Sequence, residues 1–152
     1  MTEIEFLILA NHAEAQNGLL YLVGGGWTDH LRRVPVSGPP PISHFGIGVG
    51  VSVGWDDTNR PHHLTIRIET DDGRQVAKVD GEIVVGRPPQ LKPGSDQRAV
   101  IAFNIDTQWP VAGGYRIVAF LSATPDEQKT VSFRVHDQPV QPMPLPPVLP
   151  AP

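Results

Sequence analysis

The chain has 152 residues, of which 39% are hydrophobic and 18% charged, a composition typical neither of a disordered chain nor of a membrane protein. The net charge of −4 argues against a nucleic-acid partner, because no basic block is present to neutralise phosphates. The longest basic element is the pair Arg32-Arg33, which we interpret as a solvated strand end. The absence of cysteine excludes disulfides, thiolate metal sites and cysteine nucleophiles.

The first residues do not resemble a targeting segment. Glu3 and Glu5 stand where a signal peptide requires positive charge, and the apolar stretch at residues 6–10 is too short for a signal sequence or a membrane span. We therefore expect a cytoplasmic protein with no membrane partner.

Short apolar runs separated by Gly, Pro, Asn and Asp favour strands over helices. They predict strands at residues 4–10, 19–23, 45–53, 63–70, 75–85, 98–106, 115–122 and 130–136, with a break in the fifth at Gly81. Asn17-Gly18 and Asp72-Gly73 predict tight turns, because these residue types tolerate positive φ. Residues 11–16, which lie between the first two predicted strands, could form a single helical turn.

These elements amount to eight or nine strands with short connections, and short connections favour antiparallel neighbours. We therefore expect an all-β fold, an antiparallel β-sandwich of Ig-like, Greek-key type. Seven prolines follow between Pro139 and Pro152, and such a segment is expected to be extended polyproline II rather than part of a sheet. The sequence thus predicts a β-sandwich domain at 1–137 and a Pro-rich extended tail at 138–152.

Three consecutive glycines follow the second predicted strand, in LYLVGGGWTDH at residues 20–30. A phosphate-binding loop would place Lys and Ser or Thr close behind its glycines at the start of a helix, and neither feature is present. The spacing of the dinucleotide-binding fingerprint is also absent. We therefore predict that Gly24 to Gly26 form a bend or bulge, where only glycine tolerates the torsion, and that they bind no nucleotide.

The order of several short motifs resembles an uncharacterised family of small bacterial proteins. The first is the Leu-Tyr-x-x-Gly-Gly-Gly-Trp pattern at residues 20–27, followed by WDDTNRPH at 55–62, the segment at 85–105 and Gly-Tyr-Arg at 114–116. The likeness spans nearly all of residues 3–136. It implies a β-sandwich, no known activity and no catalytic residues to transfer. The Pro-rich tail departs from the usual end of such chains.

A glycine stripe is the most unusual feature of the predicted strand at 45–53. Period-two alternation places the apolar residues on one face and Gly46, Gly48, Gly50 and Ser52 on the other. Such a stripe weakens a strand unless something packs on it. The cover could be an aromatic side chain such as Trp27, another chain or the tail, or a small ligand in the groove.

Sites for metals or catalysis have weaker support. The six histidines are scattered, and adjacent His62 and His63 would point to opposite faces of a strand. Loops at one end of the sandwich could gather carboxylates for calcium, from Asp56, Asp57, Asp126 and Glu127. Asp80 and Glu82 share one face of a strand, an arrangement that a pair of glycosidase carboxylates could use. Two acids on an exposed strand face are, however, usually just solvated. We expect no catalytic residue, no metal site and no cofactor.

The function expected from the sequence is that of a non-catalytic protein–protein interaction or assembly module. The tail carries the apolar residues Met143, Leu145, Val148 and Leu149, and it could dock on its own domain or on another chain. We hypothesise that it docks on another chain, either a copy of this protein or a larger partner. The alternative function is a small-ligand or calcium-binding β-sandwich.

Overall fold

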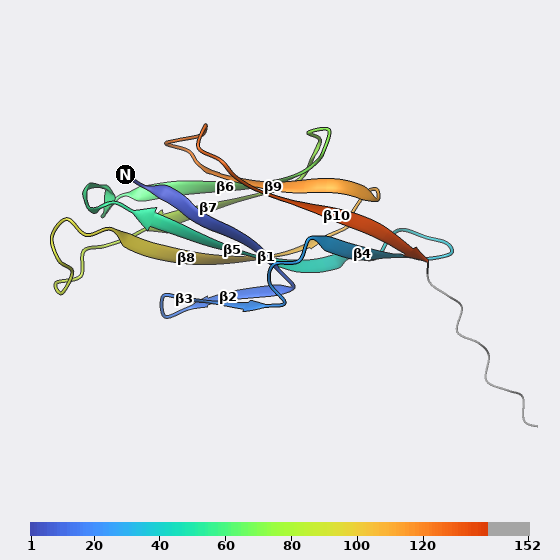
Figure 1. The fold of residues 1–152 in the computed structure, drawn as a ribbon, viewed down its shortest axis with the longest axis horizontal. Coiled ribbons are helices and arrows are strands. Elements are labelled where there is room, and N and C mark those ends of the chain that lie inside the picture. The colour runs from blue at the N-terminus through green and yellow to red at the C-terminus, as the bar shows by residue number, and fades with distance from the viewer. Residues whose placement is uncertain (140–152) are drawn as a thin grey trace, which may run out of the picture.

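The computed structural model describes residues 1–139, which form ten strands in three sheets (Figure 1). The strands are β1 (Glu3–Ala10), β2 (His12–Gln16), β3 (Leu19–Val23), β4 (Asp29–Val34), β5 (Ser43–Val53), β6 (Pro61–Thr70), β7 (Gln75–Val84), β8 (Gln97–Thr107), β9 (Gly113–Leu121) and β10 (Lys129–Pro139). The described residues contain a single helical turn, the 3-10 turn η1 (Trp55–Asp57), and no helix that could span a membrane. The apolar tail residues Met143, Leu145, Val148 and Leu149 lie outside the described residues.

The three sheets stack as layers. In Figure 1, β6 and β9 of the five-stranded sheet β4-β10-β9-β6-β7 lie at the top, the sheet β1-β5-β8 lies in the middle and the hairpin β2-β3 lies at the bottom. The five-stranded sheet curls into a half-barrel. It is mixed, because β4 runs parallel to β10 while its other pairs are antiparallel.

The core lies between the two larger sheets. The inner face of β5 presents a row of fully buried side chains, Phe45, Ile47, Val49, Val51 and Val53. Opposite them, β6 and β9 contribute Leu64, Ile66, Ile68, Tyr115, Ile117, Ala119 and Leu121. Period-two alternation thus builds the core as the sequence predicts, because every second residue of each strand points inward.

One end of the core is aromatic. The ring of Trp109 is fully buried and lies 5.0 Å from that of Tyr115 and 5.4 Å from that of Phe133, between ring centroids. The hydroxyl of Tyr115 donates to the carbonyl oxygen of Val111 at 2.5 Å. Trp27 packs edge-on against Phe133 at the same end, so its place is in the core.

The structure differs from the expected strand pattern in five respects. The first is that Gln138 and Pro139, expected in the extended tail, belong to β10 and pair with β4. Residues 12–16 form strand β2 rather than a helical turn, and the expected Asn17-Gly18 turn follows with positive φ at both residues. Strand β4 was not predicted, and its parallel pairing with β10 corrects the purely antiparallel expectation. The rule on short connections does not apply to this pair, because the two strands are far apart in the chain. Strand β7 is continuous at Gly81, where a Cβ would lie 3.2 Å from the ring of Phe103.

The interpretation of Arg32 as a solvated strand end is wrong. Arg32 is only 7% exposed, and its guanidinium donates to the carboxylate of Asp137 at 2.7 Å and to the carbonyl oxygen of Trp109 at 2.5 Å. Arg33 alternates with it and is exposed. The buried guanidinium therefore ties β4 to β10 and to the end of the core, a role that the charge alone could not indicate.

Candidate functional site

The glycine stripe of β5 is covered by this chain itself. Gly46, Gly48 and Gly50 are buried, whereas Ser52 is half-buried. A Cβ on Gly46 would lie 2.6 Å from the backbone nitrogen of Ala13, which belongs to β2. The stripe is therefore the surface on which the hairpin β2-β3 lies, and its three glycines are not open to another chain.

Side chains complete the cover over the rest of the stripe. A Cβ on Gly48 would lie 2.7 Å from Leu20 and 3.0 Å from Leu22, both of β3, and one on Gly50 would meet the ring of Phe6. The cover is therefore aliphatic at Gly48 and aromatic at Gly50, and Trp27 takes no part in it. β5 is consequently buried on both faces, by the core on one side and by the hairpin and Phe6 on the other.

The three glycines form the predicted bend. The backbone bends at Gly24 and Gly26, and both residues have positive φ, at 62° and 84°. The amide of Gly26 donates to the carbonyl oxygen of Leu9 in β1 at 2.7 Å. Because Gly24 also lies against the side chain of Asn11, a Cβ would not fit there. The bend carries the chain from the outer hairpin back to the five-stranded sheet and directs Trp27 into the core.

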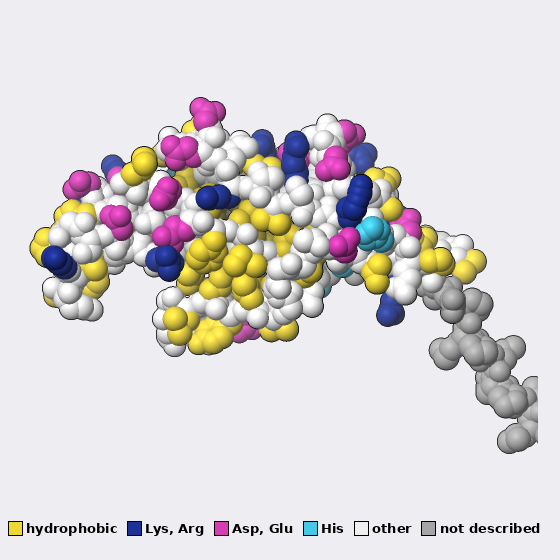
Figure 2. Space-filling view, in the orientation of Figure 1, with side chains coloured by type: hydrophobic (Ala, Val, Ile, Leu, Met, Phe, Trp, Pro, Cys, Tyr) yellow, Lys and Arg dark blue, Asp and Glu magenta, His cyan; other side chains and the backbone are white. Residues whose placement is uncertain are grey.

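The outer face of the hairpin exposes an apolar row. Leu19, Tyr21 and Val23 of β3 are 58%, 52% and 63% exposed, whereas Leu20 and Leu22 between them point to the glycine stripe. Figure 2 shows hydrophobic side chains gathered over the lower part of the molecule, where the hairpin lies. Three large apolar side chains in one row on a protruding hairpin are unusual for a surface and typical of a contact site.

Polar residues of β2 stand beside this row. Pairing in the hairpin places Gln16 opposite Leu19 and Glu14 opposite Tyr21. The third pair joins His12 to Val23, so that each exposed apolar side chain of β3 has a polar neighbour. We call these six residues the hairpin face.

A chain of histidines fastens the base of the hairpin to the sheet beneath. Nδ1 of His12 lies 3.1 Å from Nε2 of His44, and Nδ1 of His44 lies 2.7 Å from the carboxylate of Asp106 in β8. The side chain of Asn104, also in β8, bonds both the amide nitrogen and the carbonyl oxygen of Ala13, at 3.0 and 2.8 Å. These polar contacts hold the hairpin in one place on β5 and β8.

The loops proposed for calcium do meet at one end of the molecule, but their carboxylates do not converge. Asp57 lines a pocket of about 530 Å³ together with Ala123 and Thr124 of the 122–128 loop. Its carboxylate is already bonded to Thr2 and paired with Arg60. Asp56, Asp126 and Glu127 are exposed. Within the described part of the chain, no group of three or more His, Asp or Glu side chains is placed to hold a metal ion.

The pair Asp80 and Glu82 has ordinary partners on the outer face of β7. Asp80 accepts a hydrogen bond from Thr65 at 2.7 Å, which lowers the pKa of its carboxyl group, and it pairs with Lys78 at 3.1 Å. Glu82 lies 3.7 Å from Nδ1 of His63. Each carboxylate is therefore engaged with a different neighbour rather than aimed at a shared substrate position.

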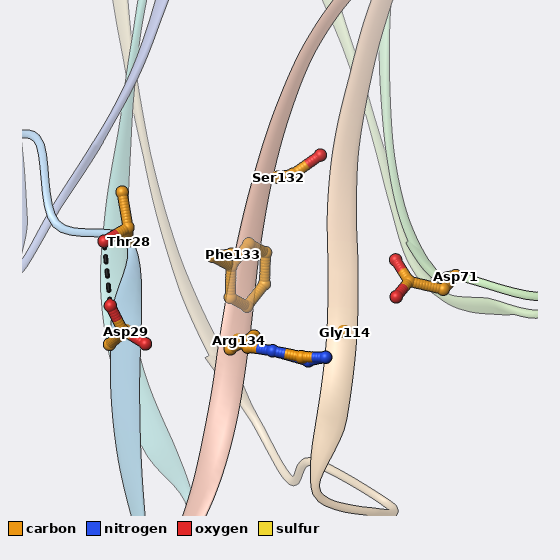
Figure 3. A pocket seen from close by; sticks show the side chains of 7 residues that line it. All are labelled: Thr28, Asp29, Asp71, Gly114, Ser132, Phe133 and Arg134. Carbon is orange, nitrogen blue, oxygen red and sulfur yellow. Dashed lines mark hydrogen bonds between the residues drawn. The ribbon is translucent and has the colours of Figure 1, made fainter.

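A second pocket, of about 350 Å³, lies beside β10 (Figure 3). Asp29 and Asp71 stand on opposite sides of it, with Arg134 between them. A hydrogen bond from His136, at 2.7 Å, and a second from Thr28 lower the pKa of Asp29. The pocket thus offers two carboxylates and one guanidinium, a set that could bind a small polar molecule.

Residues 5–136 match the model of a family of unknown function, DUF6941. The chain belongs to this family. The match runs from β1 into β10 and so includes the hairpin, the glycine stripe and the pocket beside β10. No curated protein matches the chain significantly. The DUF6941 assignment therefore agrees with the resemblance seen in the sequence, and it carries no activity with it.

The hairpin face is the feature that the sequence did not disclose. Residues 19–23 are apolar at every position, a pattern typical of a strand buried on both faces. In this member of DUF6941, Leu20 and Leu22 lie against the glycine stripe, whereas Leu19, Tyr21 and Val23 are exposed because the hairpin is the outermost layer. The only sequence signal of this face is an apolar residue at every position of a strand that follows a tight Asn-Gly turn.

Proposed function

We propose that this chain is a non-catalytic protein–protein interaction or assembly module that binds a partner through the hairpin face. The observation that supports it is the exposure of Leu19, Tyr21 and Val23 on a hairpin whose other face packs on the glycine stripe. Because each of these side chains is only a little over half exposed, burying what remains exposed supplies roughly 1–2 kcal/mol each, before the cost of association is subtracted. Tyrosine at the centre of an exposed apolar row is also typical of interface hot spots.

The chemistry of the hairpin face defines the partner. An apolar ridge with Glu14 beside Tyr21 is complementary to a protein that offers an apolar patch and a basic side chain next to it. The proposal needs neither a cofactor nor nucleic acid. Docking of residues 138–152 on another chain remains a second part of the proposal, and deleting residues 140–152 tests it separately.

The decisive experiment places a photo-reactive phenylalanine analogue at Tyr21 in cells that naturally contain the protein. A matched control carries it at Lys78, which is similarly exposed but lies on β7. We expect a cross-linked protein at Tyr21 that is absent at Lys78. The purified partner should then bind at least about tenfold more weakly to a Tyr21→Ser, Val23→Ser variant. Equal cross-linking at both positions, or unchanged affinity of the double variant, would contradict the proposal.

The pocket beside β10 supports the alternative, a small-ligand or calcium-binding sandwich. Asp29, Asp71 and Arg134 offer groups of both charges to a polar ligand. Melting the protein with calcium, with a chelator and with a panel of sugars distinguishes this alternative, because a ligand that binds only the folded state raises the melting temperature. A shift of several degrees that Asp71→Ala abolishes would favour it.

We further propose that the two larger sheets form an Ig-like, Greek-key sandwich. The support is the bond from Tyr115, near the start of β9, to the backbone of Val111. This contact resembles the tyrosine corner of such folds.

A further inference from the structure

Strand β8 is an edge strand with no protection between its two charged residues, Arg98 and Asp106. It pairs with β5 on one side and has no strand partner on the other among the described residues. Between Arg98 and Asp106 it reads AVIAFNI, with no charge, proline or glycine. Long apolar edges of this kind offer unpaired backbone groups to another strand, and proteins usually block them with charges, prolines or bulges.

The other edges of the two larger sheets are protected. β7 carries Lys78, Asp80 and Glu82, β4 is only six residues long, and β1 lies against β10 and β9. β8 has eleven residues. The core covers one face of this strand and the hairpin β2-β3 covers the other, yet residues 99–103 are all only half-buried. What remains exposed therefore lies along the edge.

We propose that two copies of this chain pair antiparallel along β8, about a two-fold axis at Ala102. In an antiparallel pair, opposite residues share a face, so the core sides of the two sheets stay aligned. This register places Arg98 opposite Asp106 of the second copy, at both ends of the contact. It also places Ile101 opposite Phe103 of the second copy on the core side, so that the strand is complementary to itself in charge and in apolar contact.

Neighbouring registers lose this complementarity. Moving the axis to Ile101 would set Asp106 opposite Asp96 of the second copy, and moving it to Phe103 would set Asp106 opposite Val100. Registers with the axis between two residues are excluded. They would set core-facing residues of one copy opposite outward-facing residues of the other, so that the core face of one sheet would continue into the outer face of the other. Of these three registers, only the one with its axis at Ala102 pairs opposite charges.

The two charged residues are available for this contact. The side chain of Asp106 is 68% exposed, and His44 engages only one of its carboxylate oxygens. Arg98 is 60% exposed and is paired with Glu5, whose pKa it lowers by hydrogen bonding. In the dimer, Arg98 would bridge Glu5 and Asp106 of the second copy, and β1-β5-β8 would become one six-stranded sheet across the two-fold axis.

A mixing experiment tests the register by light scattering and analytical ultracentrifugation. The wild type is expected to dimerise weakly, with a concentration-dependent mass, because one strand pair buries less than a standard interface. Arg98→Asp alone and Asp106→Arg alone each set like charges opposite one another, and we expect at least about tenfold weaker dimers. An equimolar mixture of the two variants restores both opposite-charge pairs, and the heterodimer should regain the wild-type affinity.

Cysteine cross-linking provides an independent test, since the native chain has no cysteine. Ala102→Cys lies on the axis, next to its own copy, and should form an intermolecular disulfide on mild oxidation. Val100→Cys, on the same face of β8, would lie opposite Asn104 of the second copy and should not. Circular dichroism confirms that each variant is folded.

Three results would overturn the proposal. The first is a mass equal to one chain at every concentration up to the millimolar range. The second is equal cross-linking of the two cysteine variants. The third is dimerisation that requires residues 140–152 but ignores Arg98→Asp. Because Tyr21→Ser leaves β8 intact, it should not change the dimer, so failure of this proposal is distinguishable from failure of the hairpin proposal.

Discussion

Adding one methyl group to the glycine stripe should destabilise the protein at Gly46 and have almost no effect at Gly48. At Gly46 a Cβ would lie 2.6 Å from the nitrogen of Ala13 and 2.7 Å from the carbonyl carbon of His12, which are backbone atoms of β2. At Gly48 the nearest atoms are methyl groups of Leu20 and Leu22, at 2.7 and 3.0 Å. Methyl groups can rotate away, whereas the backbone can move only if the base of the hairpin is displaced.

The magnitudes follow from two opposing contributions. Replacing glycine by alanine inside a strand stabilises it by about 0.5–1 kcal/mol, and overpacking costs about 1–3 kcal/mol. For Gly46→Ala we take the upper part of that range, since backbone must move, and expect a net loss of about 1–2 kcal/mol, or about 2–8 °C in melting temperature. Gly48→Ala should lie within about 0.5 kcal/mol of the wild type, because the two contributions nearly cancel.

Urea denaturation, together with hydrogen exchange, measures both effects. The amide of Ala13, which donates to Asn104 at 3.0 Å, should exchange faster in Gly46→Ala than in Gly48→Ala, because it belongs to the displaced segment. Ser52→Ala is the control on the same strand face, since this half-buried position already carries a Cβ. If Gly46→Ala is as stable as the wild type, or if Gly48→Ala costs more, then the hairpin does not lie on β5 as described.

Two further predictions concern buried polar groups. Burial lowers the pKa of His30 below its ordinary value of 6.5, so the unfolded chain binds a proton that the folded chain does not. Stability should therefore be greatest above about pH 6.5 and fall as the pH drops below it. The urea midpoint of the wild type should be lower at pH 5.5 than at pH 7.5, and His30→Gln should reduce this difference. An equal difference in the two proteins would refute the role of His30. Arg32→Lys should lower the unfolding free energy by about 1–3 kcal/mol, because one ammonium group cannot reach both Asp137 and Trp109. The control is Arg33→Lys, at an exposed position, which should change the unfolding free energy little. Equal effects of the two substitutions would count against the buried role of Arg32.

Local patterns carried most of the prediction of the fold. Alternation in residues 45–53 placed Phe45 and its neighbours in the core, and the Asn17-Gly18 turn fixed the first hairpin. The bend at Gly24 to Gly26 was likewise predictable, because positive φ and the missing Lys are both local properties. These features depend on a few adjacent residues, which is why a sequence discloses them.

What the sequence could not disclose depends on contacts between distant segments. β4 contains Arg32 and Arg33 in a row, which argues against a buried strand until Asp137 is known to lie beside it. For the cover of the glycine stripe, the sequence left open an aromatic side chain such as Trp27, another chain or the tail, and a small ligand. The structure uses Leu20, Leu22 and Phe6 instead, and no local rule says which part of a chain will reach a given surface.

The hairpin that covers β5 explains why this fold exposes an apolar face. A two-stranded hairpin is a single layer with two sides, so burying one side on Gly46 and Gly48 leaves the other at the surface. Leu20 and Leu22 are used inside, and the alternation of β3 then forces its remaining apolar residues outward. If these exposed residues were polar, the hairpin would cover β5 without exposing an apolar surface. In this chain, covering one surface of the sheet therefore creates a second apolar surface, and that surface is the one through which we propose that the protein binds a partner.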